Sequence, residues 1–274
     1  MDRANGDPRV RWRVVVAHYR EPLDWLLPLM EQSREQASVY VYHKGGMGRG
    51  AYAIGNLTGL GGARLRWIDC DNIGREAETF ARHLFDHYDS LATMTAFLQG
   101  NPVASHFGKV LRETIRAMQR APVARPVELA RSPAWRCRLL GSPLMSVDGD
   151  GCKSHCGLAI SPTCDHLSMH GARRGRAFGL AAPSLRCQSP FWFASGGQFL
   201  LSRAAAHTRP RSLYGLIVRQ LHAEAKYNGR QHLYPYIYER LWQRIWNCSW
   251  VAPSPNRKNP LAYMLNGAER TSPG

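Results

Sequence analysis

DCDNIGREAETFARHLFDHYDSLATMTAFLQGN, residues 69–101, joins a polar turn, an amphipathic helix and an apolar strand end to end. Apolar side chains recur at the 3.6-residue spacing of a helix at Ala77, Phe80, Ala81, Leu84, Phe85 and Tyr88. Polar residues crowd the start of this helix and also follow the strand predicted at residues 93–98. In an open α/β sheet both places lie at the carboxyl edge of the strands, where ligands bind. We therefore expect a ligand site at residues 72–76 and 99–101.

Strand and helix patterns alternate along the rest of the chain. Continuous apolar and β-branched runs predict strands at residues 13–19, 38–43, 64–69 and 93–98, and another short strand within residues 190–202. Amphipathic spacing predicts further helices at residues 22–29, 109–120, 212–225 and 235–246. This alternation favours an α/β fold in which a single, mainly parallel sheet is flanked by helices.

Composition divides the chain into one domain, two tails and an irregular region. Residues 12–250 are expected to form the α/β domain, with flexible tails at residues 1–11 and 251–274. Residues 121–189 are rich in Pro, Gly, Arg and Cys and predict an irregular insert. No stretch reaches the roughly 18 apolar residues of a spanning helix, and the polar start lacks the apolar core of a signal peptide. We therefore expect no transmembrane segment and a cytoplasmic location.

The formal net charge of the chain is +16. Such a surface favours nucleic acid, phosphorylated ligands or anionic membranes as partners. The basic residues are mostly Arg and are dispersed along the chain, and GC-rich codon usage produces the same bias without selection for binding. A polyanion such as tRNA is therefore one candidate partner, and an unspecific compositional bias is the alternative.

The polar helix start supplies the first group of candidate site residues: Asn72, Gly74, Arg75 and Glu76. Free amide groups at a helix N-terminus bind anions, a glycine lets a ligand approach the backbone, and a guanidinium suits phosphate or carboxylate. The alternative is structural. In that interpretation Asp71 or Asn72 caps the helix, Arg75 pairs with a surface acid, and Glu76 completes the capping arrangement.

Residues that follow strands supply the second group. Gln99, Gly100 and Asn101 come directly after an apolar strand and are expected to line the same cleft, with an ordinary turn as the alternative. His18 follows the first strand and is a candidate for acid–base or binding chemistry.

Metal ligation is an alternative for three further groups. Two acidic pairs, Asp148 with Asp150 and Asp69 with Asp71, offer oxygen ligands for a divalent metal but also suit turns. Structural zinc is an alternative to free thiols in a loose loop for the group Cys152, Cys156, Cys164, His166 and His170. His83 and His87 are expected at a surface or interface rather than on a metal.

Seven cysteines, an odd and scattered number, argue against a disulfide framework. Buried thiols are the preferred interpretation for four of them: Cys70, Cys137, Cys187 and Cys248.

Several motifs together resemble a family of bacterial and fungal domains of unknown function. In chain order they are VVVAHYREPLDWL, VYVYHKG, NIGREAETFARHLFDHYDSL, TAFLQGNP, GGQFLLSR and YERLW. The N-x-G-R-E helix start and the F-L-Q-G strand are the most specific parts. That family is in turn remotely similar to nucleotide-sugar glycosyltransferases with a GT-A-type sheet. The resemblance implies a GT-A-like fold and a nucleotide-activated donor. Where such enzymes carry a metal-binding Asp-x-Asp, this chain has Gln99, Gly100 and Asn101, so the resemblance does not extend to metal-dependent transfer.

A glycosyltransferase-like transferase is therefore the leading functional hypothesis. We expect Arg75, Lys44 or Arg203 to neutralise the donor phosphates in place of a metal. Gln99, Asn101 and Gln198 are expected at the donor or acceptor, and the candidates for the base are Glu76, His18 and Glu239. The alternatives are an aminoacyl-tRNA-dependent transferase of the cyclodipeptide-synthase type, supported by charge alone, and a non-catalytic polyanion-binding module.

Overall fold

The structure is a computed structural model that describes residues 12–32, 37–46, 65–102, 110–120, 137–140, 143–146, 192–194 and 197–228. Six residues within 235–246 are described as well: Pro235, Tyr238, Glu239, Trp242, Ile245 and Trp246. The elements, in chain order, are β1 (Trp12–His18), α1 (Leu26–Gln32), β2 (Ala37–His43), β3 (Leu65–Asp69), α3 (Arg75–Asp86), η3 (Tyr88–Ser90), β4 (Met94–Gln99), α4 (Val110–Arg120), β5 (Cys137–Leu139), β6 (Pro143–Ser146), β7 (Trp192–Ala194), β8 (Phe199–Ser202), α9 (Arg203–Ala206) and α10 (Arg211–Asn228).

The main sheet has six strands in the order β3-β2-β1-β4-β8-β5. The first four of these strands run parallel to one another, whereas β8 runs antiparallel to both β4 and β5. A separate two-stranded sheet pairs β6 with β7. The predicted α/β class with a mainly parallel sheet is confirmed, and the antiparallel β8 makes that sheet mixed.

The direction in which strands are added reverses between β1 and β4. The chain adds β2 and β3 on one side of β1, and then returns through α3 to place β4 on the other side. Connections that diverge in this way leave a crevice outside the carboxyl ends of the two central strands. The register pairs Ala17 with Gln99 and His18 with His43, so these residues lie side by side at that edge.

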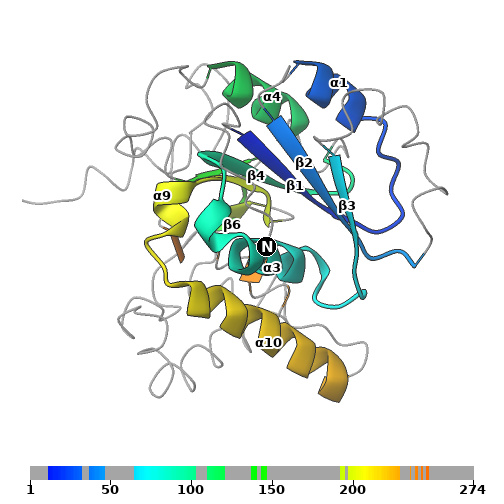
Figure 1. The fold of residues 1–274 in the computed structure, drawn as a ribbon, viewed down its shortest axis with the longest axis vertical. Coiled ribbons are helices and arrows are strands. Elements are labelled where there is room, and N and C mark those ends of the chain that lie inside the picture. The colour runs from blue at the N-terminus through cyan, green and yellow to red at the C-terminus, as the bar shows by residue number, and fades with distance from the viewer. Residues whose placement is uncertain are drawn as a thin grey trace, which may run out of the picture.

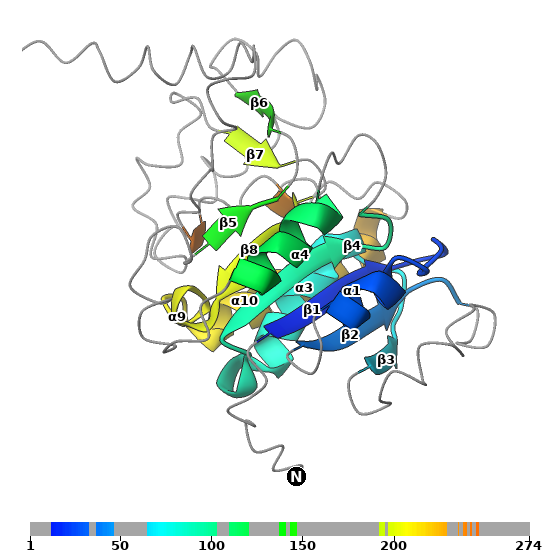
Figure 2. The ribbon, with the colours of Figure 1, turned by 90° about the horizontal axis from the view of Figure 1, so that it is seen from above.

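Helices cover both faces of the main sheet (Figures 1 and 2). Because successive side chains of a strand point to opposite faces, β1 contributes to two cores. Val14 and Val16 pack with α1 and α4 on one face, and Val15 packs with α3 and α10 on the other. The second core also holds Trp242 and Trp246, whose rings stack 5.1 Å apart. Within the described residues, no helix has the length and apolar character needed to cross a bilayer.

The region predicted as an irregular insert contributes strands to both sheets. Cys137–Leu139 forms the edge strand β5, and Pro143–Ser146 forms β6. Three residues are too few to show a strand period, which is why no sequence pattern predicted β5. The thiol predicted at Cys137 is wrong, because this residue is disulfide-bonded. The rest of the insert, both tails, Asp148, Asp150 and the Cys152–His170 zinc candidates lie outside the described residues.

Candidate functional site

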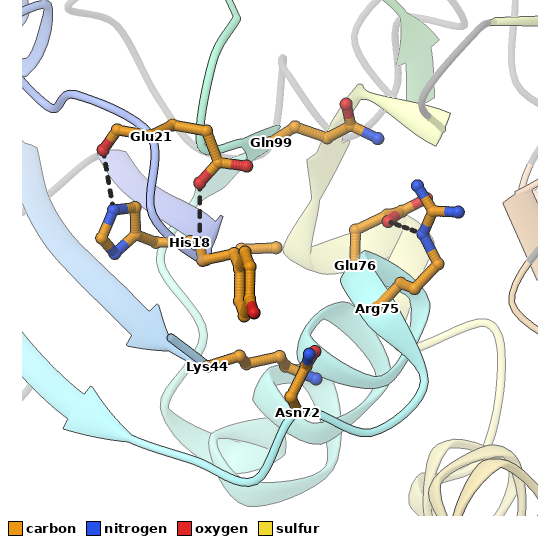
Figure 3. A pocket seen from close by; sticks show the side chains of 9 residues that line it. His18, Glu21, Lys44, Asn72, Arg75, Glu76 and Gln99 are labelled. Atoms are coloured by element: carbon orange, nitrogen blue, oxygen red, sulfur yellow. Dashed lines mark hydrogen bonds and ion pairs between the residues drawn. The ribbon is translucent and has the colours of Figure 1, made fainter. Parts of the chain in front are cut away.

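A polar cavity of about 270 Å³ lies at the carboxyl edge of the sheet, between the ends of β1 and β4 (Figure 3). It is lined by Ala17, His18, Tyr19, Glu21, Lys44, Asn72, Arg75, Glu76 and Gln99. Of the residues predicted from the sequence, the structure therefore brings together six: His18, Lys44, Asn72, Arg75, Glu76 and Gln99. They come from the ends of three parallel strands and from the start of one helix, as expected for a switch point.

The start of α3 has an unusual backbone that fixes the position of Arg75. Gly74 precedes the helix with φ 63°, and Arg75 itself has φ 51°, a left-handed conformation that non-glycine residues rarely adopt. The N-cap residue is Gly74, which has no side chain, so the predicted capping by Asp71 or Asn72 is wrong. The strained backbone directs the half-exposed Arg75 guanidinium toward the cavity (Figure 3).

The lack of a side chain at Gly74 allows close packing of α3 and does not serve to let a ligand approach the backbone. A Cβ atom at this position would lie 2.6 Å from Glu78 Cβ and 3.1 Å from Leu221 Cβ. Gly74 is not among the residues that line the cavity, so the structure gives a different reason for this glycine than the one expected from the sequence. It allows α3 to start in the left-handed conformation, close against α10.

Glu76 carries the most perturbed carboxyl group of the cavity. Burial raises its pKa to about 7, with the Arg75 guanidinium 3.6 Å away lowering it and the nearby Glu239 carboxylate raising it further. At neutral pH the group is therefore divided between its acid and base forms. A carboxyl of this kind in a cleft can take up or release a proton during a reaction.

The start of β8 lies next to the end of β4. Gln198 Oε1 accepts a hydrogen bond from the Gln99 backbone amide at 3.1 Å. Gln198 is fully buried, so it supports Gln99 from behind and does not line the cavity. Glu239 approaches from the C-terminal segment, where its Cγ would lie 3.2 Å from a Cβ at Gly197. Gln198 and Glu239, predicted as a binding residue and a candidate base, thus lie near the site, but neither lines the cavity.

Gly100 and Asn101 do not line the cavity. The Gly100 carbonyl accepts a hydrogen bond from Trp25 Nε1 at 2.8 Å, and a Cβ here would lie 2.4 Å from Glu21 Oε2. Glu21 Oε2 in turn accepts hydrogen bonds from the backbone amides of Tyr19 and Arg20. Gly100 therefore leaves room for the turn after β1.

His18 is held by hydrogen bonds on both ring nitrogens. Its Nε2 lies 2.9 Å from the Glu21 carbonyl oxygen, which only accepts, so Nε2 carries the proton. Its Nδ1 lies 2.9 Å from His43 Nδ1, which must then be the donor. Burial lowers the pKa of His18, which favours this neutral form. Because the lone pair of His18 faces His43, the geometry makes His18 a positioning residue rather than the expected base.

Lys44 reaches the cavity wall but is already paired. Its Nζ lies 2.7 Å from Glu78 Oε2 and donates a second hydrogen bond to the Ile73 carbonyl. The opposite carboxylate oxygen of Glu78 lies 2.5 Å from Arg82 and 3.2 Å from His222. Burial raises the pKa of Glu78, yet Lys44 and Arg82 together hold it below its ordinary value. Lys44 is thus less available for phosphate than the sequence suggested.

Glu78 and Glu21 are the site-forming residues that sequence reasoning missed. The position of Glu78 in the first turn of a helix indicates only that it favours the helix dipole, because a solvated acid and a buried one look the same in the sequence. The sequence pattern that could have indicated its ion pair is the i, i+4 spacing between Glu78 and Arg82. The same spacing is also common on exposed helices.

Arg203 does not belong to this site. β8 is antiparallel to β4, and the Arg203 amide donates a hydrogen bond to the carbonyl of Thr93, just before β4 begins. Arg203 therefore lies at the amino edge of the parallel strands, and its predicted role at the donor phosphates is wrong. Two residues at the ends of one short strand, Gln198 and Arg203, lie at opposite edges of the sheet.

Two other expectations concern metals and histidines. In the described part of the chain, no group of three or more His, Cys, Asp or Glu side chains could hold a metal ion. Asp69 Oδ1 instead accepts a hydrogen bond from Trp67 Nε1 at 2.9 Å. His83, expected at a surface or interface, is fully buried and its Nδ1 lies 2.9 Å from the Tyr42 hydroxyl. The surface prediction for His83 is therefore wrong.

Comparison with known proteins agrees with the motif resemblance. A search of curated proteins finds no match for the chain. One family model matches residues 14–259, a span that includes both strands and the helix around the cavity. The chain therefore belongs to the family described as "Protein of unknown function (DUF3431)".

Proposed function

We propose that this protein is a transferase that binds a nucleotide-activated donor, a nucleotide sugar, in the cavity between β1 and β4. The observation that carries the proposal is the convergence of Arg75, Glu76 and Gln99 at the switch point of the sheet (Figure 3). Open α/β sheets bind nucleotides at this place. The remote GT-A-like resemblance of the motifs points to glycosyl as the transferred group.

Arg75 is the residue that we assign to the donor phosphates. Its side chain is 47% exposed, lines the cavity and lies 3.6 Å from Glu76. A planar guanidinium matches phosphate oxygens with two parallel hydrogen bonds. Arg75 is also the first residue of α3, and the N-terminus of a helix favours negative charge.

Glu76 is the residue that we assign to proton transfer. In its ionised form it accepts the proton of an acceptor hydroxyl while the oxygen of that hydroxyl bonds to the donor carbon. The bond between that carbon and the phosphate oxygen breaks, and the nucleoside diphosphate leaves with the electron pair. Arg75 stabilises the negative charge that develops on the leaving group. A pKa of about 7 suits a base that works near neutral pH.

By the motif resemblance, Gln99 corresponds to the position of the metal-binding acids in nucleotide-sugar glycosyltransferases. An amide side chain donates and accepts hydrogen bonds but is a weak ligand for a divalent cation. The backbone amide of Gln99 is hydrogen-bonded to the buried Gln198, and Gln99 itself lines the cavity. The donor set does not fit an Asp-x-Asp metal site, so we assign Gln99 to hydrogen bonding with the sugar or the acceptor.

Calorimetry with a panel of nucleotide sugars, followed by a transfer assay, tests the proposal. We expect one donor class to bind, Arg75→Ala to weaken that binding about tenfold or more, and Arg116→Ala, which removes an exposed arginine from α4, to leave it unchanged. Glu76→Gln should retain donor binding and lower kcat about 10²- to 10⁴-fold. In the wild type, kcat/KM should rise with pH through about 7.

Two results would overturn the proposal. Absence of binding by every nucleotide donor would contradict the assignment of the cavity. Donor binding without turnover, unaffected by Glu76→Gln, would identify a non-catalytic binding module instead.

A further inference from the structure

A second group of polar side chains lies at the opposite edge of the sheet, and several of its atoms have no hydrogen-bond partner. They are buried atoms of β1, β2 and α3: Arg13 Nε, Arg13 Nη1, Ser38 Oγ and His83 Nε2. Buried polar atoms in folded proteins are nearly always paired with protein, water or a ligand. Their concentration in one place therefore requires a physical explanation.

These atoms belong to neighbouring side chains on one face of the sheet. Arg13 and Ser38 are register partners on adjacent strands, and both face the layer of α3. The Arg13 guanidinium lies 4.6 Å from the centre of the Tyr40 ring. The centre of the His83 ring lies 5.1 Å from the centre of the same ring, and the charge of Arg13 acts on His83, so both side chains lie beside Tyr40.

Each of the unpaired atoms can donate a hydrogen bond. Burial lowers the pKa of His83 well below its ordinary value, so its ring is neutral and carries one proton. Burial raises the pKa of the Tyr42 hydroxyl, so this hydroxyl stays protonated and can donate to His83 Nδ1, which lies 2.9 Å away. With Tyr42 as the donor, the single proton of His83 is on Nε2. Guanidinium, hydroxyl and imidazole groups thus all offer N–H or O–H.

The group also carries positive charge with no carboxylate to balance it. Arg13 is 9% exposed, and within the described residues no carboxylate lies at ion-pair distance from it. Arg66 stacks on the same Tyr40 ring at 5.5 Å, and the charge of Arg203 also reaches Arg13. The carboxyl end of α3 supplies at most about half a negative charge. A buried cation in this situation calls for an anionic partner.

We propose that the amino edge of the sheet, around Arg13, Ser38 and His83, binds a small oxyanion of the phosphate class. Arg13 supplies two donors and the compensating charge, Ser38 and His83 supply one donor each, and the exposed Arg66 and Arg203 attract the anion to the edge. Ordered water would satisfy the donors but would leave the charge of Arg13 uncompensated. The site is separate from the cavity at the carboxyl edge, and it does not depend on the function proposed for that cavity.

Inorganic phosphate is the probe for this site. The full chain is titrated with phosphate by calorimetry, and its thermal unfolding is followed in buffers with and without phosphate. We expect phosphate to raise Tm in the wild type and in Arg75→Ala, whose substitution affects only the opposite edge. Arg13→Lys keeps the charge but loses the two aligned donors, and should weaken phosphate binding about tenfold.

Arg13→Met removes the charge and the donors while keeping the length of the side chain. We expect it to abolish the phosphate-dependent rise in Tm, and to unfold at the same or a higher temperature than the wild type when phosphate is absent. If Arg13→Met fails to fold, Ser38→Ala provides the second variant, and it should weaken phosphate binding several-fold.

Three results would overturn the inference. The first is the absence of a phosphate-dependent rise in Tm in the wild type. The second is phosphate binding as tight as that of the wild type in both Arg13→Lys and Ser38→Ala. The third is loss of the entire phosphate effect in Arg75→Ala, which would assign the anion to the cavity at the carboxyl edge instead.

Discussion

Glu76 and Glu78 lie two residues apart on α3, and both are buried, but their surroundings differ in charge. Glu78 contacts Lys44 at 2.7 Å and Arg82 at 2.5 Å, and these cations hold its pKa below the ordinary value against the effect of burial. Glu76 has one half-exposed guanidinium at 3.6 Å and a second carboxylate nearby, so burial dominates and its pKa rises to about 7.

This difference separates a structural carboxylate from a reactive one. Burial acts in the same direction on both groups, so the number and distance of the cations decide the protonation state. Glu78 stays ionised across the physiological range and ties β2, α3 and α10 together through its partners. Glu76 changes its charge near neutral pH, which a base requires and a structural ion pair does not.

The largest expected effect follows from removing the structural carboxylate. Glu78→Gln leaves the buried Lys44 and the partly buried Arg82 without their counter-charge. Breaking a buried ion pair on one side costs about 3–5 kcal/mol. Urea unfolding should therefore show a loss of this size, and the control Asp89→Asn, at an exposed carboxylate, should stay within about 0.5 kcal/mol. A loss of less than about 1 kcal/mol of unfolding free energy in Glu78→Gln would contradict the structural role of this carboxylate.

Gly74→Ala is expected to have the next largest effect. The new methyl group would lie 2.6 Å from Glu78 Cβ in a backbone with φ 63°. Left-handed strain and the clash together should lower the free energy of unfolding by about 2–4 kcal/mol. Gly46→Ala is the matched control, because its φ is also positive, at 72°, but nothing lies within 4 Å of its added Cβ. Equal losses in the two variants would show that the contact with Glu78 is unimportant.

Glu76→Gln should change stability in a pH-dependent way. The raised pKa means that the folded protein prefers the protonated carboxyl, so the wild type loses stability as the pH rises from 4.5 to about 7. The neutral amide avoids this loss. The variant should match the wild type near pH 4 and exceed its unfolding free energy by up to about 3 kcal/mol at pH 8. Parallel stability curves for the two proteins across this range would contradict the assignment of the pKa.

His222→Gln should have the smallest effect. His222 lies 3.2 Å from Glu78 Oε1, but its side chain is 36% exposed, and solvent weakens the interaction. We expect a change of no more than about 0.5 kcal/mol in urea unfolding at pH 7. A change as large as that of Glu78→Gln would mean that His222, and not Lys44 and Arg82, stabilises the carboxylate.

Sequence patterns predicted the edge of the sheet at which the cavity lies. Apolar runs and helical spacing follow directly from burial, so they located β1, β2, β4 and α3 and the polar residues at their ends. Lys44, Arg75, Glu76 and Gln99 meet at one cavity for this reason.

Strand direction and charge pairing were not predictable in the same way. No local pattern distinguishes an antiparallel β8 from a parallel strand, and this direction is what places Arg203 at the opposite edge from Gln198. Similarly, Glu76 and Glu78 are chemically identical in the sequence. The difference between their pKa values depends on Lys44, which pairs with Glu78 and is 34 residues away from it along the chain.

The most direct test of the central claim is a carboxyl titration of the protein by ¹³C NMR, with Glu76→Gln used to assign the resonance. We expect one glutamate with a midpoint near pH 7 that is missing from the spectrum of Glu76→Gln. We also expect the Glu78 resonance to titrate below the ordinary range of a glutamate. If the resonance assigned to Glu76 titrates near pH 4, Glu76 is an ordinary carboxylate and the proposed base of the transfer reaction is wrong.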